Sequence, residues 1–154
     1  GNATAQVQLG DAYRFGQHGL EKSLDRALQL SELAAAQGNA RSQFRLGFSY
    51  EFGDCVKIDY KIAVQWYRRA AEQGYPEAQY NLGAMIYHGK GVAQLHDEGE
   101  EVAKSSEEAV KWFRLAAAQG HSEALFNLGL CHVKGLGVPE DDHEALRLCK
   151  RAAA

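Results

Sequence analysis

Four copies of the dipeptide Leu-Gly follow one another at nearly regular intervals along the chain. They are Leu9-Gly10, Leu46-Gly47, Leu82-Gly83 and Leu128-Gly129, separated by 37, 36 and 46 residues. A second landmark keeps the same step, since Ala27, Ala63, Ala109 and Ala145 are spaced by 36, 46 and 36 residues. A period of this length indicates an array of helical units, in which each unit buries its apolar face on its neighbours.

Each unit contains two segments with helical periodicity. In the second unit the small and aromatic residues recur on one face of a 3.6-residue turn, and the third unit repeats the pattern. These residues are Ala63, Trp66, Tyr67, Ala70 and Ala71, and then Ala109, Trp112, Phe113, Ala116 and Ala117. In the leading segment we expect the leucine, the glycine and the residue three positions later to face the core. A glycine inside a helix costs about 1 kcal/mol relative to alanine, so we predict a closely packed neighbouring helix at each glycine.

Glycine-rich segments connect the two helices of each unit, and capping residues precede the second helix. The glycines supply positive φ angles that end a helix. Asp59, the Ser105-x-x-Glu108 box, and Asp141 or Asp142 are the expected helix starts in units two to four. The sequence therefore predicts an all-α fold of about four antiparallel helix-turn-helix repeats. We place them at approximately 3–38, 39–74, 75–120 and 121–154, forming one array over 1–154.

The repeated sequence pattern resembles the Sel-one-like repeats, which are relatives of the tetratricopeptide repeats. The third unit carries it most fully, as Ala78-Gln79-Tyr80-Asn81-Leu82-Gly83, Gly89-Lys90-Gly91-Val92, Ala109-Val110-Lys111-Trp112-Phe113-Arg114 and Ala117-Ala118-Gln119-Gly120. The resemblance covers all four units. It implies a right-handed α-α superhelical solenoid and an adaptor or scaffold role in protein complexes, in settings as different as endoplasmic-reticulum quality control, bacterial host interaction and signalling.

Composition excludes several classes of function. With a net charge of −3 and 24% charged residues, the chain lacks the excess of clustered lysine and arginine expected of a protein that binds nucleic acid. No apolar run approaches the length of a membrane span, so we expect no direct membrane insertion. Cys55, Cys131 and Cys149 are too few and too irregularly spaced for a disulfide framework, which favours a reducing compartment such as the cytoplasm.

No enzymatic motif stands out in the sequence. Cys131, His132, His143 and Cys149 are metal-type residues but lack the spacing of a zinc site. His132 occupies a position where other repeats carry a core tyrosine, so we interpret it as a partly buried imidazole with a hydrogen-bond partner. We expect no catalytic residue, cofactor or metal. A hydrolase of the cysteine-rich repeat type remains a remote alternative without an assembled nucleophile and base.

The first helix of each repeat is the expected partner-binding surface. At 100° per residue, the positions two before, one after and five after each glycine point away from the predicted core. Exposed aromatic and arginine side chains are the usual anchors of interfaces, while Asn81 and Asn127 resemble asparagines that hold a peptide in related repeats. The predicted protein-binding or peptide-binding residues are Arg41, Arg45, Phe48, Phe52, Asn81, His88, Asn127, Leu130 and Lys134. An alternative role for Phe48 and Phe52 is packing between repeats.

A ten-residue excess distinguishes the third unit and extends from Val92 to Glu101. Its acidic run is a secondary candidate for binding a basic partner, and a solvated loop is the alternative. The run comprises Asp97, Glu98, Glu100 and Glu101. Neither end of the chain carries the polar cap of a terminal repeat, so we expect a segment of a longer array. The uncapped ends also leave open a structural role through self-association into a homo-oligomer.

Overall fold

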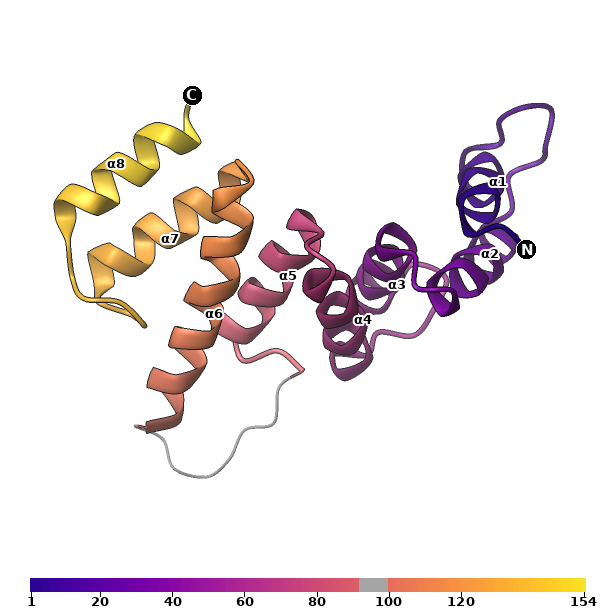
Figure 1. Cartoon of the computed structure of the whole chain (residues 1–154). Coiled ribbons are helices and arrows are strands. Elements are labelled where there is room, and N and C mark those ends of the chain that lie inside the picture. Colours follow the sequence, from indigo (N-terminus) through magenta and orange to yellow (C-terminus); the bar gives the residue numbers. More distant parts are fainter. Residues whose placement is uncertain (92–99) are drawn as a thin grey trace. The chain divides into compact units, whose positions relative to one another are not determined.

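The computed structural model describes residues 1–91 and 100–154, and within these ranges it contains eight α-helices and no strand (Figure 1). The helices are α1 (Ala3–Phe15), α2 (Leu24–Ala36), α3 (Ala40–Phe52), α4 (Tyr60–Glu72), α5 (Pro76–Tyr87), α6 (Glu100–Ala118), α7 (Ser122–Lys134) and α8 (Asp142–Ala152). The predicted all-α class and the two helices per repeat are confirmed.

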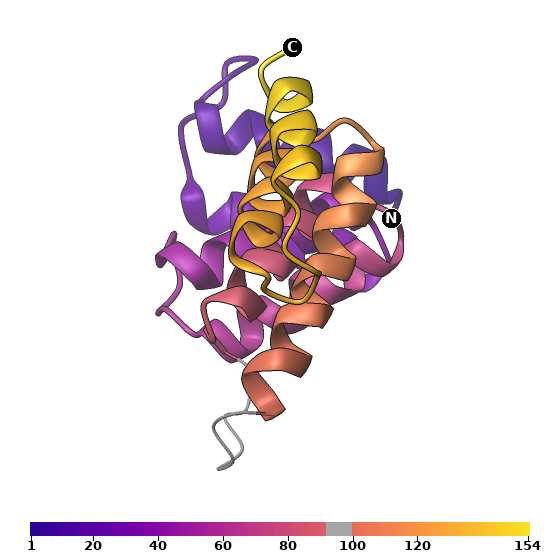
Figure 2. The same cartoon turned by 90° about the vertical axis from the view of Figure 1, so that its left-hand side faces the viewer.

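The helices form two compact units, Gly1–Gln73 and Gly74–Ala154, which we call unit 1 and unit 2. Unit 1 contains the hairpins α1–α2 and α3–α4, and α2 packs on α3. Unit 2 contains the hairpins α5–α6 and α7–α8, and α6 packs on α7. The two hairpins of unit 2 can be followed from α5 to the C-terminal α8 in Figure 1 and Figure 2. Each unit is therefore a pair of helical hairpins with its own shared core.

The predicted capping chemistry is confirmed at two of the three positions. The Asp59 side chain accepts from the Ile62 backbone N–H at 3.0 Å, and Asp141 accepts from the Glu144 backbone N–H at 2.9 Å. The expected start at Ser105 is wrong, because α6 begins at Glu100 and Ser105 lies inside the helix. The Ser105 hydroxyl instead donates to the Ile86 carbonyl at 3.1 Å. Residues Glu100 and Glu101 thus belong to a helix rather than to the expected loop.

Small and aromatic residues of the second helices make the core, as predicted. Tyr67 and Phe113 are 0% and 1% exposed, and the repeated alanines of α4 and α6 are buried as well. The leading-helix glycines lie against these rings. A Cβ built on Gly47 would be 2.6 Å from Tyr67 Cδ1, and one on Gly83 would be 2.9 Å from Phe113 Cδ1. The close approach expected at the mid-helix glycines is confirmed at these two positions.

The first repeat departs from this pattern. Leu9 is 43% exposed, whereas Leu46 and Leu128 at the same repeat position are 1% and 6% exposed. The expectation that Leu9 faces the core is wrong. In unit 1, α3 packs on α2 as well as on α4, whereas α1 packs mainly on α2, so Leu46 has a neighbouring helix that Leu9 lacks.

A repeated glutamine pair joins the two helices in three of the hairpins. The side-chain amide of the glutamine after the second helix donates to the side-chain carbonyl of a glutamine in the first. The pairs are Gln37 to Gln6 at 2.6 Å, Gln73 to Gln43 at 2.7 Å, and Gln119 to Gln79 at 2.9 Å. Because both partners are polar and far apart in sequence, the pattern of apolar residues did not reveal this link.

Candidate functional site

Four predicted binding residues form one line along α3, which we call the α3 stripe: Arg41, Arg45, Phe48 and Phe52. Their spacing of four, three and four residues keeps them on one helical face. The Asn39 side chain caps the start of α3, and Gly53 ends it in the left-handed conformation. Phe48 and Phe52 are 42% and 58% exposed, with ring centroids 4.5 Å apart. Exposure of both rings argues against the alternative that they are buried between repeats.

The arginine half of the α3 stripe is attached to α1 through one carboxylate. Arg45 forms an ion pair with Asp11, and the Arg41 Nη2 lies 3.2 Å from Asp11 Oδ2. The Arg45 side chain is only 19% exposed, whereas that of Arg41 is 56% exposed. Arg45 therefore connects the two hairpins of unit 1, while Arg41 still faces solvent. The outward position of Asp11 follows from helical geometry, but its pairing depends on where the tertiary structure places α1 relative to α3.

A second ion pair joins the C-terminal ends of α1 and α3. Arg14 in α1 contacts Asp54, which follows α3 by two residues. The Arg14 guanidinium holds the pKa of Asp54 below its ordinary value, and burial opposes this effect only in part. Phe15, adjacent to Arg14, is 63% exposed. The ion pair thus brings the end of α1, with its exposed Phe15, beside the phenylalanine end of the α3 stripe.

Replacing Arg14 with glutamine is expected to lower the free energy of unfolding at pH 7 by about 1 kcal/mol. A lowered folded-state pKa means that Asp54 stabilises the fold above its unfolded-state pKa, about 3.9. This contribution disappears as the pH falls from about 4 through the lowered pKa. Urea unfolding at pH 7 and at lower pH values should therefore show the two proteins converging in acid.

Arg147→Gln is the matched control for this prediction. Arg147 pairs with Glu144 one helical turn away on α8, and its side chain is 57% exposed. We expect no measurable loss of stability from this change, because solvent screens the pair. A stability difference between wild type and Arg14→Gln that stays constant into acid would contradict the role assigned to Asp54.

The remaining predicted binding residues lie in unit 2, in two groups. His88 and Lys134 are exposed at the C-terminal ends of α5 and α7. Asn81, Asn127 and Leu130 are half-buried. His88 contacts Tyr87 edge to face, with ring centroids 5.2 Å apart. Of the acidic run, Asp97 and Glu98 lie outside the described residues, and Glu100 and Glu101 open α6.

Two exposed apolar residues of α7 were missed by the sequence reasoning. Phe126 and Val133 are 49% and 47% exposed, on either side of Leu130. Residues 126, 130 and 133 have the spacing of one helical face, so helical periodicity could have identified them. They extend the apolar part of the predicted α7 surface.

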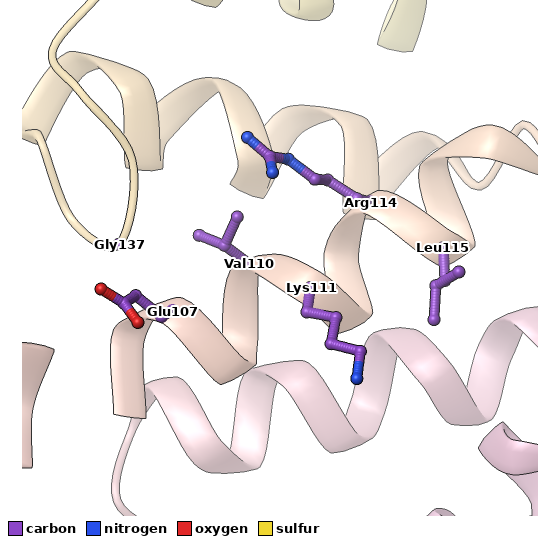
Figure 3. Close-up of a pocket in the computed structure, with 6 residues that line it drawn as sticks. All are labelled: Glu107, Val110, Lys111, Arg114, Leu115 and Gly137. Carbon is purple, nitrogen blue, oxygen red and sulfur yellow. The ribbon is translucent and has the colours of Figure 1, made fainter. Parts of the chain in front are cut away.

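Two shallow hollows are lined by residues outside α3. One, of about 460 Å³, is beside α6 and is lined by Glu107, Val110, Lys111, Arg114, Leu115 and Gly137 (Figure 3). The charged ends of Lys111 and Arg114 point in different directions, so they do not converge on one anion. The other, of about 640 Å³, is beside α1 and includes Leu9, His18 and Asp11, the carboxylate that pairs with the arginines of the α3 stripe. Neither combines exposed aromatic rings with a paired cationic cluster.

Potential metal ligands do not cluster in the part of the chain that the structure describes. Across 1–91 and 100–154, no group of three or more His, Cys, Asp or Glu residues is placed to hold a metal ion. Burial raises the pKa of the Cys55 and Cys131 thiols, which disfavours the nucleophilic thiolate at neutral pH. His132 is half-buried, and its Nδ1 lies 3.2 Å from the Pro139 carbonyl oxygen, as expected for an imidazole with a partner.

No helix within residues 1–91 and 100–154 is long and apolar enough to span a bilayer.

The Sel1 repeat family profile matches residues 3–39, 40–75, 76–121 and 122–154. The crystal structure of c5321, a protective antigen of uropathogenic Escherichia coli strains with an SLR fold, superposes with a TM-score of 0.87 at 38% identity, covering 99% of this chain and 30% of that one. Chitin synthase regulatory factor 3 of Schizosaccharomyces pombe is 39% identical over 79 residues, 51% of this chain and 8% of that protein. The ERAD-associated E3 ubiquitin-protein ligase component HRD3B of Arabidopsis thaliana is 35% identical over 72 residues, 47% of this chain and 12% of that protein.

Proposed function

Since this chain belongs to the Sel1 repeat family, we propose that it is a protein-interaction module that binds a protein or peptide partner and performs no catalysis. The names of two relatives support this role, one a regulatory factor and the other a ubiquitin-ligase component. Because the matches span small parts of those proteins, the proposal concerns this array and not their whole activities.

The observation that carries the proposal is the exposure of Phe48 and Phe52 beside the arginines of the α3 stripe. Phenylalanine rings provide a large apolar area, and arginine provides directed hydrogen bonds, so both are enriched at interfaces. The Asp11 contacts hold this surface in place before a partner arrives, which reduces the ordering cost of binding. In unit 2, the second set of candidate binding residues comprises Asn81, His88, Asn127, Leu130 and Lys134.

A Phe48→Ala/Phe52→Ala double variant is expected to lose partner binding by about 10-fold or more, because interface aromatics contribute the largest share of affinity. Selection of random displayed peptides on the wild-type chain would provide ligands, whose dissociation constants are then measured with both proteins. We expect the stability cost of the double variant to be small, because both rings are about half exposed in the unbound chain.

Leu33→Ala is the matched control, since Leu33 is 54% exposed on α2 of the same unit. This variant should retain wild-type affinity. Selected peptides that bind the folded double variant as tightly as the wild type would move the site away from the α3 stripe. Repeating the measurement with Asn127→Ala and Lys134→Ala would then test the unit 2 surface.

Self-association is a second candidate function, favoured by the exposed apolar residues Leu9, Phe126, Val133 and Leu146. Leu9 and Leu146 are 43% and 55% exposed, on α1 and α8 respectively. Heterologous contacts between such surfaces join copies of a chain. The molar mass in solution, measured across a concentration series, separates this role from the first, because a monomer at every concentration would exclude it.

A further inference from the structure

We infer that the α3 stripe recognises a short peptide segment carrying a carboxylate at one end and two apolar side chains at the other. The inference rests on the proposed protein-binding function and specifies the chemistry of its partner. It depends on the division of the α3 stripe into a cationic half and an aromatic half, which the contacts of unit 1 create.

The cationic half retains one positive charge in excess. Arg41 and Arg45 share the single carboxylate of Asp11. The two carboxylates at the opposite end of α3 have partners of their own, because Glu51 accepts from the Tyr67 hydroxyl at 2.8 Å and Asp54 pairs with Arg14. Arg41 is the more exposed of the two arginines, and its planar guanidinium has five N–H donors. This end of the α3 stripe therefore favours a carboxylate, which a guanidinium binds in a forked geometry.

The aromatic half presents two rings from successive turns. Phe48 and Phe52 are 4.5 Å apart between centroids and both exposed, and Phe15 is exposed at the neighbouring end of α1. Burying such rings releases about 25 cal/mol per Å² of apolar area. Apolar side chains of a partner would therefore gain most of their binding free energy at this end.

The distance between the halves determines the spacing in the partner. The midpoints of the arginine pair and the phenylalanine pair are seven residues apart on α3, about 10 Å along a helix that rises 1.5 Å per residue. An extended peptide advances about 3.3 Å per residue, so about three residues cover this distance. A carboxylate two or three residues away from an apolar pair matches both halves at once.

Fluorescence anisotropy with labelled synthetic peptides tests this inference on the whole chain. The probe contains a glutamate, two serines and a Phe-Leu pair, in both orders, and the control peptide has lysine in place of glutamate. We expect one glutamate order to bind about 10-fold more tightly than its lysine counterpart, with an affinity that falls as salt increases. Arg41→Glu should reverse this preference, and Arg41→Gln should reduce it. Arg114→Glu, an exposed charge reversal on α6, should leave it unchanged.

The outcomes separate this inference from the proposed function. Equal binding of the glutamate and lysine peptides, or a preference unaltered by Arg41→Glu, would overturn the inference. The same holds if displayed peptides that require Phe48 and Phe52 contain no acidic residue, although the protein-binding proposal would then stand. If no displayed peptide depends on the α3 stripe, both fail at this site. Circular dichroism of each variant establishes that the helices remain folded.

Discussion

Gly137→Ala is expected to destabilise the chain by about 3 kcal/mol or more, because the added methyl group would collide with backbone that has no room to move. A Cβ on Gly137 would lie 2.5 Å from the Ser106 carbonyl oxygen and 2.7 Å from the Glu107 nitrogen. Both atoms belong to α6, whose backbone is fixed by its own hydrogen bonds. The glycine φ of +69° adds a conformational cost for alanine. Chemical denaturation measures the loss.

Gly135→Ala separates the two causes, since Gly135 belongs to the same connection and has a similar φ of +62°. The nearest atom to a Cβ at Gly135 is Glu140 Cβ at 3.7 Å, an ordinary contact. This variant should therefore lose only the conformational part, about 1 kcal/mol. Equal losses for the two variants would show that the turn does not press on α6 as the structure describes.

Gly47→Ala is the second change with a large expected effect, a loss of about 1 to 3 kcal/mol through overpacking. The new methyl group would lie 2.6 Å from Tyr67 Cδ1 and 2.8 Å from Tyr67 Cε1. Tyr67 is fully buried, and its hydroxyl donates to Glu51, so the ring has little freedom to withdraw. The gain in helix propensity, about 1 kcal/mol, opposes this cost only in part.

Gly10→Ala is the control at the same position of the first repeat. Its nearest contacts would be the Ala27 carbonyl oxygen and Leu30 Cβ, both at 3.5 Å. Here the helix propensity of alanine should prevail and raise the free energy of unfolding by up to about 1 kcal/mol. Thermal and urea unfolding of both variants check the opposite signs. A destabilised Gly10→Ala protein would contradict the looser packing of the first repeat.

Much of the fold could be predicted because it follows from local periodicity. The positions of Leu46-Gly47 and of Ala63 and Tyr67 recur in the repeats with helical spacing. They identified both helices of a repeat and the face that each helix buries. The Asp59 and Asp141 caps were also local, since a cap contacts backbone only three residues away. The start of α6 could not be predicted in this way. The sequence around Ser105 resembles a helix cap, but the helix begins five residues earlier, at Glu100.

The candidate site was predicted only in part. Helical geometry placed Arg41, Arg45, Phe48 and Phe52 on one face, and the structure exposes both phenylalanines. Helical geometry did not predict that Asp11 pairs with both arginines, an arrangement that leaves Arg41 as the more accessible charge. These contacts join residues 30 and 34 positions apart, so they depend on how α1 and α3 lie beside each other. The same reason hid the pairing of Arg14 with Asp54.

By itself the sequence determined the repeat, the two helices of each repeat, the residues that end these helices and the line of side chains along α3. All of these depend on residues within a few helical turns of one another. Only the tertiary structure decided that Leu9 is exposed while Leu46 is buried, that Gly47 is closely packed while Gly10 is not, and that Asp11 neutralises one of two arginines. Equivalent residues in successive repeats share their local geometry, but burial and pairing depend on the helix that lies next to each one.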